Sequence, residues 1–116
     1  MTPPASAPRK GDLIWLDFSP QAGHEQAGRR PALVLTSSMF QRATGLMLAC
    51  PVTSRVRGLP FEVPLPAGLK VSGVILVHHA RSVDWRARNA EVIGAVPDET
   101  LFQVLDILNA TLEGEE

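Results

Sequence analysis

The chain has 116 residues, of which 45 % are hydrophobic and 20 % charged, which suits one compact domain with a real core and is too short for two. No apolar run reaches the roughly 20 residues that a membrane span needs, and the start of the chain lacks the apolar stretch of a signal peptide. The single cysteine, Cys50, has no internal partner for a disulfide, so a reducing, cytoplasmic setting is expected; its apolar neighbours predict a buried thiol rather than a nucleophile.

The net charge of −1 conceals an uneven distribution of charge. Residues 1–90 hold all 11 lysines and arginines and only five of the 12 acidic residues. Residues 91–116 hold the other seven acidic residues and no lysine or arginine. A basic body with an acidic carboxyl-terminal segment indicates a polyanionic partner for the body. The alternative is a dipolar surface with no partner, and the charges alone do not separate the two.

Short apolar segments bounded by turn residues predict a chain of strands. Residues 1–10, rich in Pro, Ala and Ser, predict a flexible tail, and a single domain is expected over residues 11–116. The strands are expected, in chain order, at 11–18, 31–37, 46–53, 61–65, 71–77 and 91–96. Between them lie a polar loop over 19–30, a turn or short helix over 38–45 and a basic loop over 54–60.

A helix is expected from Pro97 to the end of the chain, with Asp98 and Glu99 in its first turn, where carboxylates favour the helix dipole. Its apolar stripe, at helical spacing, consists of Leu101, Leu105, Leu108 and Leu112. Short strands followed by one helix predict a mainly β fold: a small antiparallel barrel or curled sheet with a carboxyl-terminal helix packed on it.

The sequence lacks the residues that several kinds of site require. His78 and His79 are adjacent and have no accompanying CxxC, HxxxH or carboxylate cluster, so no metal site is expected. The glycine loop at 23–28 lacks the lysine and the following helix of a phosphate-binding loop, and no serine lies in a GxSxG elbow. No cofactor is therefore expected.

Arginines gather in the two loops that follow the first and third predicted strands. If these loops are neighbours, Arg29, Arg30, Arg55 and Arg57 form a cationic groove suited to phosphate. Glu25 near Arg30 would add a proton acceptor, and the pair would suit metal-free attack of an RNA 2′-hydroxyl on its own phosphodiester. The alternative is a structural Glu25–Arg30 salt bridge that only fixes the loop, and composition alone favours it.

Three further side chains allow two interpretations each. Thr53, at the end of a predicted strand, would either hold a phosphate oxygen or cap a turn. Trp15 lies in an apolar strand and is expected in the core, whereas Trp85, within the arginine-rich RSVDWRAR, is more open to a surface role such as base stacking.

Five segments, taken in order, resemble the MazF/PemK family of toxin endoribonucleases, and its MazF branch most. They are GDLIWLDFSP at 11–20, EQAGxRP at 25–31, PVTS at 51–54, GLPFEV at 58–63 and SVDWRAR at 82–88. The resemblance implies an SH3-like antiparallel barrel with a carboxyl-terminal helix, of the MazF/CcdB kind, assembled as a homodimer. It also implies a toxin that inhibits translation by sequence-specific, metal-independent cleavage of single-stranded RNA, leaving a 2′,3′-cyclic phosphate and a 5′-hydroxyl.

The resemblance also implies a cognate antitoxin whose acidic tail occupies the RNA groove, and a set of site residues. The expected catalytic residues are Arg30, Thr53 and Glu25. The expected RNA-binding residues are Phe18, His24, Gln26, Arg29, Arg55, Arg57, His79, Arg81 and Arg86. The chain departs from the family at His78–His79, where Asp-Gln is common, so the cleavage sequence does not carry over; His79 would either contact a base or close a turn.

Two rival functions fit the same fold class. A CcdB-type gyrase poison would act through carboxyl-terminal residues that include a tryptophan, whereas this chain ends LEGEE. A non-catalytic SH3-like peptide-binding module would need an aromatic groove, yet aromatics make up 5 % of the chain and tyrosine is absent. The glycines before Pro31 further predict that the site is completed only when RNA closes the loop, with Glu25 on the mobile side and Arg30 on the rigid side.

Overall fold

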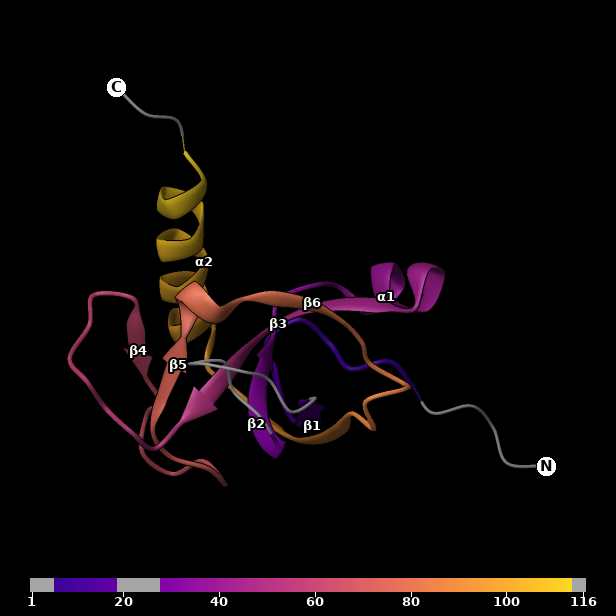
Figure 1. The fold of residues 1–116 in the computed structure, drawn as a ribbon, viewed down its shortest axis with the longest axis horizontal. Helices are drawn as coiled ribbons and strands as arrows, with labels where there is room; N and C mark the ends of the chain where they lie inside the picture. The colour runs from indigo at the N-terminus through magenta and orange to yellow at the C-terminus, as the bar shows by residue number, and fades with distance from the viewer. Residues whose placement is uncertain (1–5, 19–27, 114–116) are drawn as a thin grey trace.

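The protein folds as a strongly curled antiparallel sheet with a helix at its carboxyl end, as seen in a computed structural model that describes residues 6–18 and 28–113 (Figure 1). The strands of this described part are β1 Asp12–Phe18, β2 Gly28–Val34, β3 Leu46–Thr53, β4 Glu62–Pro64, β5 Val74–Leu76, β6 Arg81–Asp84 and β7 Glu91–Ala95. The helices are α1 Ser38–Thr44, α2 Asp98–Leu112 and a 3₁₀ turn, η1 Val77–His79.

The strand order is β4-β5-β3-β2-β1-β7, and β6 pairs with β3 outside this path. All the pairings are antiparallel. The long strand β3 organises the sheet, because its first half pairs with β6 and its last two residues pair with β5. The predicted mainly antiparallel fold with a carboxyl-terminal helix is confirmed; within the described residues the sheet is barrel-like but not closed.

Two cores lie on the two faces of the sheet, because successive side chains of a strand point to opposite faces. Leu13 in β1 and Leu33 in β2 belong to the core under α2, whereas their neighbours Ile14 and Ala32 belong to the core on the other face. All four are buried. Burial of a large aliphatic side chain contributes about 1.5–3 kcal/mol, so a shift of one residue in register would expose both cores and is strongly disfavoured.

Helix α2 covers the first core with part of the predicted leucine stripe. Leu101 is buried, and Leu105 and Leu108 pack partly buried against the same core. Leu112, expected in the stripe, is 74 % exposed, because the helix extends past the edge of the sheet (Figure 1). None of the described helices combines the length and apolar character that crossing a membrane requires.

Three strand predictions differ from the structure. The strand expected at 71–77 is only three residues long, β5 Val74–Leu76, and Val77 belongs to the 3₁₀ turn. Strand β2 begins at Gly28, three residues earlier than expected, because Arg29 and Arg30 pair with Asp17 and Leu16 of β1. These two arginines therefore lie in a strand and not in a loop. Strand β6 was not predicted at all; four residues are too short for a periodic pattern to stand out.

The second core is closed by a hydrogen-bond hub at Gln41. This fully buried side chain donates from Nε2 to the carbonyl of Pro8 (2.6 Å) and accepts from Thr36 Oγ1 (2.6 Å). The backbone carbonyl of Gln41 accepts a hydrogen bond from Nε1 of Trp85 (3.1 Å). Ala7 and Pro8 are buried in the domain, within the range 1–10 where the sequence predicted a flexible tail.

The tryptophan predictions were wrong. Trp85, expected to be open to a surface role, is 2 % exposed because its indole N–H reaches Gln41. Trp15, expected in the core, is only half-buried. Cys50 is buried as predicted, and burial raises the pKa of its thiol to about 12, so it remains a neutral, unreactive thiol at neutral pH.

We expect Gln41→Leu to lower the free energy of unfolding by about 2 kcal/mol or more, because it leaves the buried Pro8 carbonyl without a donor and Thr36 without an acceptor. Urea denaturation measures the change. Gln103→Leu, at an exposed position of α2, is the matched control and is expected to stay within about 0.5 kcal/mol of the parent. Equal stability of the two variants would contradict the role of the hub.

Candidate functional site

The pairing of β1, β2 and β3 gathers predicted site residues on one face of the sheet. Leu16 of β1 faces Arg30, and Ala32 of β2 faces Pro51. The β2–β3 pairs end there, and Arg30 and Thr53 each lie two residues further along their strands, Thr53 being paired with Val74 of β5. Because cross-strand neighbours share a face, these side chains project on the same side as the second core. We call this surface, formed by Phe18, Arg30, Pro51, Thr53 and Arg81, the site face.

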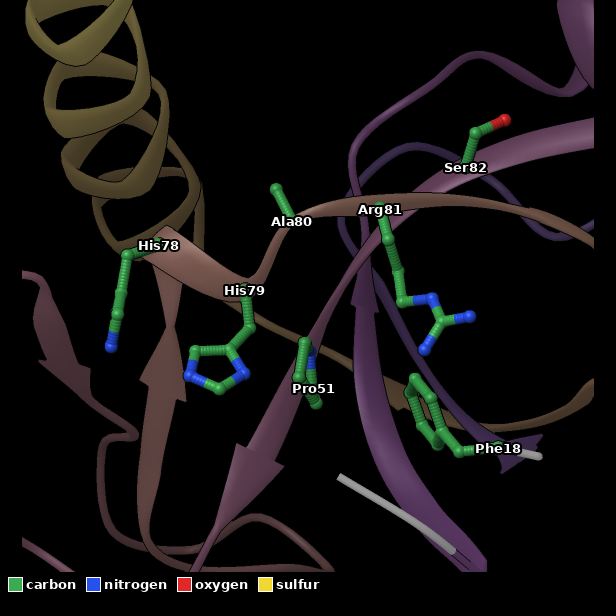
Figure 2. A pocket seen from close by; sticks show the side chains of 7 residues that line it. All are labelled: Phe18, Pro51, His78, His79, Ala80, Arg81 and Ser82. Atoms are coloured by element: carbon green, nitrogen blue, oxygen red, sulfur yellow. The ribbon is translucent and has the colours of Figure 1, made fainter. Parts of the chain in front are cut away.

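A pocket of about 550 Å³ opens on the site face (Figure 2). Its lining consists of Phe18, Pro51, His78, His79, Ala80, Arg81 and Ser82. Arg81 is directed at Phe18, with its guanidinium carbon 5.7 Å from the ring centroid, which is a cation–π distance. The pocket therefore combines an aromatic wall with a cationic group. Pro51, Ala80 and Ser82 were not singled out from the sequence, because small apolar or hydroxyl side chains carry no distinctive signal.

The two histidines lie on a 3₁₀ turn and not on a strand. The ring of His79 lies beside Pro51, whereas His78 points away from Pro51 and Phe18 (Figure 2). The His78 ring packs at a tilt against Phe61, with the ring centroids 5.5 Å apart. It also makes an edge-to-face contact with the His79 ring, and those two centroids are 4.5 Å apart. His78 thus packs against His79. Both residues line the pocket, and the His79 ring is the one beside Pro51.

Thr53 is buried at the end of β3, and its Oγ1 accepts the backbone N–H of Arg55 at 3.1 Å. The turn-capping interpretation therefore describes its contact in this structure. An accepted hydrogen bond leaves the hydroxyl proton available for a second partner, since a threonine hydroxyl both donates and accepts. Capping the turn and donating to a phosphate oxygen are compatible roles.

The basic loop after β3 is attached to β4 through Glu62. The carboxylate accepts the backbone N–H groups of Arg57 (3.1 Å) and Gly58 (3.0 Å). The side chains of Arg55 and Arg57 are exposed. This anchor fixes the course of the loop while both guanidinium groups remain at the surface, beside the end of β3 that carries Thr53.

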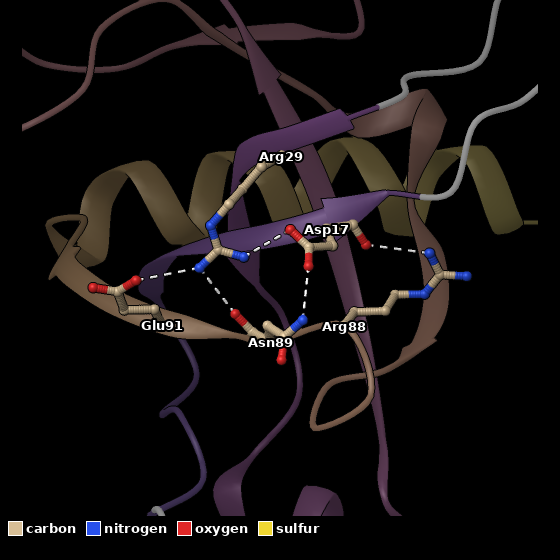
Figure 3. A network of polar contacts seen from close by, with 5 residues as sticks. All are labelled: Asp17, Arg29, Arg88, Asn89 and Glu91. Atoms are coloured by element: carbon tan, nitrogen blue, oxygen red, sulfur yellow. Dashed lines mark hydrogen bonds and ion pairs between the residues drawn. The ribbon is translucent and has the colours of Figure 1, made fainter.

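Arg29 is not brought together with the site face. As the neighbour of Arg30 in β2 it projects from the opposite face. Its NH1 donates to Asp17 Oδ1 (2.8 Å), and its NH2 donates to the carbonyl of Asn89 (3.0 Å) and to Glu91 Oε1 (3.2 Å) (Figure 3). Hydrogen bonds from Asn89 and from Arg29 lower the pKa of Asp17 below its usual value. The sequence offered no signal for this network, because its members are far apart along the chain.

The remaining predicted residues lie elsewhere. Arg86 stacks over the Trp85 ring, 4.6 Å from its centroid, and is not part of the pocket lining. His24, Glu25 and Gln26 lie outside the described residues, and so does the predicted closure of their loop. Within residues 6–18 and 28–113, no three His, Cys, Asp or Glu side chains are grouped as metal ligands.

Comparisons with known proteins place the chain in one family. A family model described as PemK-like, MazF-like toxin of type II toxin–antitoxin system matches residues 9–112. The endoribonuclease toxin MazF of Escherichia coli strain K12 is 48 % identical over 105 residues, which cover 90 % of this chain and 94 % of the relative.

The fold has solved counterparts. A crystal structure of MazF from Deinococcus radiodurans superimposes with a TM-score of 0.87 at 57 % identity, covering 91 % of this chain and 96 % of the other. A MazE–MazF structure from the same organism superimposes with a TM-score of 0.83, at the same identity and coverage. This chain therefore belongs to the PemK-like, MazF-like family of toxins of type II toxin–antitoxin systems.

Proposed function

We propose that the protein is a sequence-specific, metal-independent endoribonuclease that cuts single-stranded RNA in the cytoplasm, and that it serves as a toxin by halting translation. The observation that carries the proposal is the alternation along β2 and β3 that places Arg30 and Thr53 on one face of the sheet, beside a pocket lined by Phe18 and Arg81. The 48 % identical relative, named an endoribonuclease toxin, supports the same reaction.

In the proposed reaction, the 2′-hydroxyl oxygen of the RNA attacks the adjacent phosphorus after losing its proton to a base. The bond between phosphorus and the 5′-oxygen breaks, and that oxygen takes up a proton from water, leaving a 2′,3′-cyclic phosphate and a 5′-hydroxyl. Arg30 stabilises the charge that develops on the phosphorane oxygens, and the Thr53 hydroxyl donates to one of them. We propose Glu25, within the segment 19–27, as the base. Arginine supplies the positive charge that a metal ion would otherwise provide.

The pocket is suited to an unstacked base next to the scissile phosphate. Phe18 itself is only 3 % exposed, with Arg81 over its ring, so a base in this pocket would meet Arg81 and His79, which offer donors to its edge. Arg55 and Arg57, exposed on the anchored loop, would contact the backbone on one side. His24, Gln26 and Arg86 remain proposed RNA contacts.

We propose two protein partners as well: a second copy of this chain, and an antitoxin with an acidic tail that competes with RNA for the site face. A D. radiodurans relative has been crystallised as MazE–MazF.

The mechanism predicts that Arg30→Ala lowers kcat/KM for RNA by about 100-fold or more, and that Thr53→Val lowers it by about 10-fold or more, because each removes a transition-state donor. The assay is cleavage of a long single-stranded RNA in EDTA, with the cut ends sequenced. Arg42→Ala, exposed on α1, is the matched control and should cut normally.

Cleavage that disappears with the chelator, or that survives the loss of Arg30, would refute the mechanism. Intact RNA under all conditions together with inhibited gyrase would instead point to the CcdB-type function.

A second prediction concerns Gly73, which lies against the backbone of Thr53. A Cβ at Gly73 would lie 2.8 Å from the Thr53 carbonyl carbon and closer still to its oxygen, and φ is +124°. Gly73→Ala should therefore displace Thr53, lowering both stability and the cleavage rate. Gly68→Ala is the matched control, because its φ is also positive (+92°) but nothing lies within 4 Å of the added Cβ.

The control should cost about 1–2 kcal/mol from backbone strain alone and leave cleavage unchanged. Urea denaturation and initial cleavage rates provide the two readouts. If the two glycine variants behaved alike, the close approach of Gly73 to Thr53 would have no part in the site.

A further inference from the structure

The Asp17–Arg29 ion pair lies at the point where β1 and β2 enter the segment 19–27. The two residues are cross-strand partners, and only the pair Phe18–Gly28 lies between them and that segment. A pair at this position acts on the separation of the two strand ends. It therefore bears on every residue near those ends, including Phe18 and Arg30 on the site face.

The contacts of Arg29 leave little capacity for phosphate. The guanidinium meets two carboxylates, Asp17 at 2.8 Å and Glu91 at 3.2 Å, together with the carbonyl of Asn89 at 3.0 Å. One positive charge thus faces two negative charges. A phosphate brought to this arginine would add a third anion to a cluster in which the shortest contact of Arg29, from NH1 to Asp17 Oδ1 at 2.8 Å, is a charge-assisted hydrogen bond.

Asn89 completes the network from the other side. Its φ of +56° is a left-handed conformation that asparagine tolerates better than most residues. In this conformation its amide donates to Asp17 Oδ2 (2.8 Å) while its carbonyl accepts from Arg29. Arg88 adds a bond from NH1 to the Asp17 carbonyl (3.2 Å), and the backbone N–H of Asp17 donates to the Arg88 carbonyl (2.9 Å). The end of β1 is therefore held by the segment that leads into β7.

Because Arg29 and Arg30 are adjacent in one strand, the orientation of one constrains the other. A strand that rotates about its axis carries both side chains with it, to opposite sides. Arg29 held by Asp17, Asn89 and Glu91 on one face keeps Arg30 directed to the other face, toward the row that continues to Thr53.

We propose that Asp17 and Arg29 are positioning residues for RNA cleavage: their ion pair orients Arg30 on the site face, and Arg29 itself does not bind phosphate. This inference rests on the proposed function and assigns Arg29 a different role from the phosphate contact expected from the sequence. It also assigns a role to Asp17, which the sequence did not single out.

The test uses Asp17→Asn, Arg29→Gln and the double variant, with kcat and KM measured over a range of salt concentrations. If the pair positions Arg30, each single variant should lower kcat by about 10- to 100-fold with KM changed less than twofold, since misplacement of a catalytic group acts on the chemical step. The salt dependence of RNA binding should not change, and the double variant should be about as impaired as either single one.

A phosphate-binding Arg29 makes opposite predictions. Arg29→Gln would then raise KM, and the slope of log K against log salt would become shallower by about 0.7, the value for one phosphate contact on a single strand. Asp17→Asn would release the arginine and tighten RNA binding. Either result would overturn the proposal. Arg29→Lys keeps one charged contact and should recover part of kcat.

An NMR titration of the Asp17 carboxyl separates failure of this inference from failure of the proposed function. The pKa of Asp17 should lie below 3.8 in the parent protein and rise toward 3.8 in Arg29→Gln, because one of its two hydrogen-bond donors is lost. The ion pair then contributes stability above about pH 3.8 and loses it as pH falls further. A parent protein that leaves RNA intact would refute the function, whereas an unshifted Asp17 would refute the network that this inference requires.

Discussion

The register of β1, β2 and β3 is the constraint on which the rest of the molecule depends. Two apolar cores, one on each face of the sheet, specify this register, because a slip of one residue would turn both outward. The same alternation that buries Leu13 and Ile14 on opposite faces separates Arg29 from Arg30. Packing of the cores thus decides, at the end of the sheet, which arginine faces the pocket and which faces the carboxylates.

The fold places the carboxylates around Arg29 and the arginines of the site face on different faces of the sheet. The acidic carboxyl-terminal part is not confined to the surface of α2, since Glu91 at the start of β7 shares Arg29 with Asp17. The carboxylates of this cluster lie across β2 from the site face. An excess of negative charge in sequence is therefore compatible with a basic surface on the side that carries Arg30, Thr53 and Arg81. The net charge of −1 describes neither face.

Much of the fold could be predicted from the sequence because alternation of apolar residues and the leucine spacing are local signals. The departures arise from contacts between residues that are far apart in the sequence. Arg29 and Arg30 were assigned to a loop because their polar character conceals their pairing with β1, which is a non-local contact. Trp85 was assigned to the surface because arginines flank it, yet a hydrogen bond to a residue 44 positions away buries it.

The site was predictable to the extent that strand ends could be located. The ends of the first and third strands were located correctly, and they carry Phe18 and Thr53. The partners of Arg29 were not predictable, since Asp17, Asn89 and Glu91 meet only after the sheet has formed. For the same reason the close approach of Gly73 to Thr53, which depends on the pairing of β3 with β5, leaves no mark in the sequence.

The most direct measurement is a crystal structure with RNA whose attacking 2′-hydroxyl is replaced by hydrogen, so that the strand binds without being cut. The account predicts that the scissile phosphate contacts Arg30 and the Thr53 hydroxyl, that a neighbouring base enters the pocket beside Arg81, and that Arg29 remains paired with Asp17. A phosphate held by Arg29, with Asp17 released from it, would contradict the account.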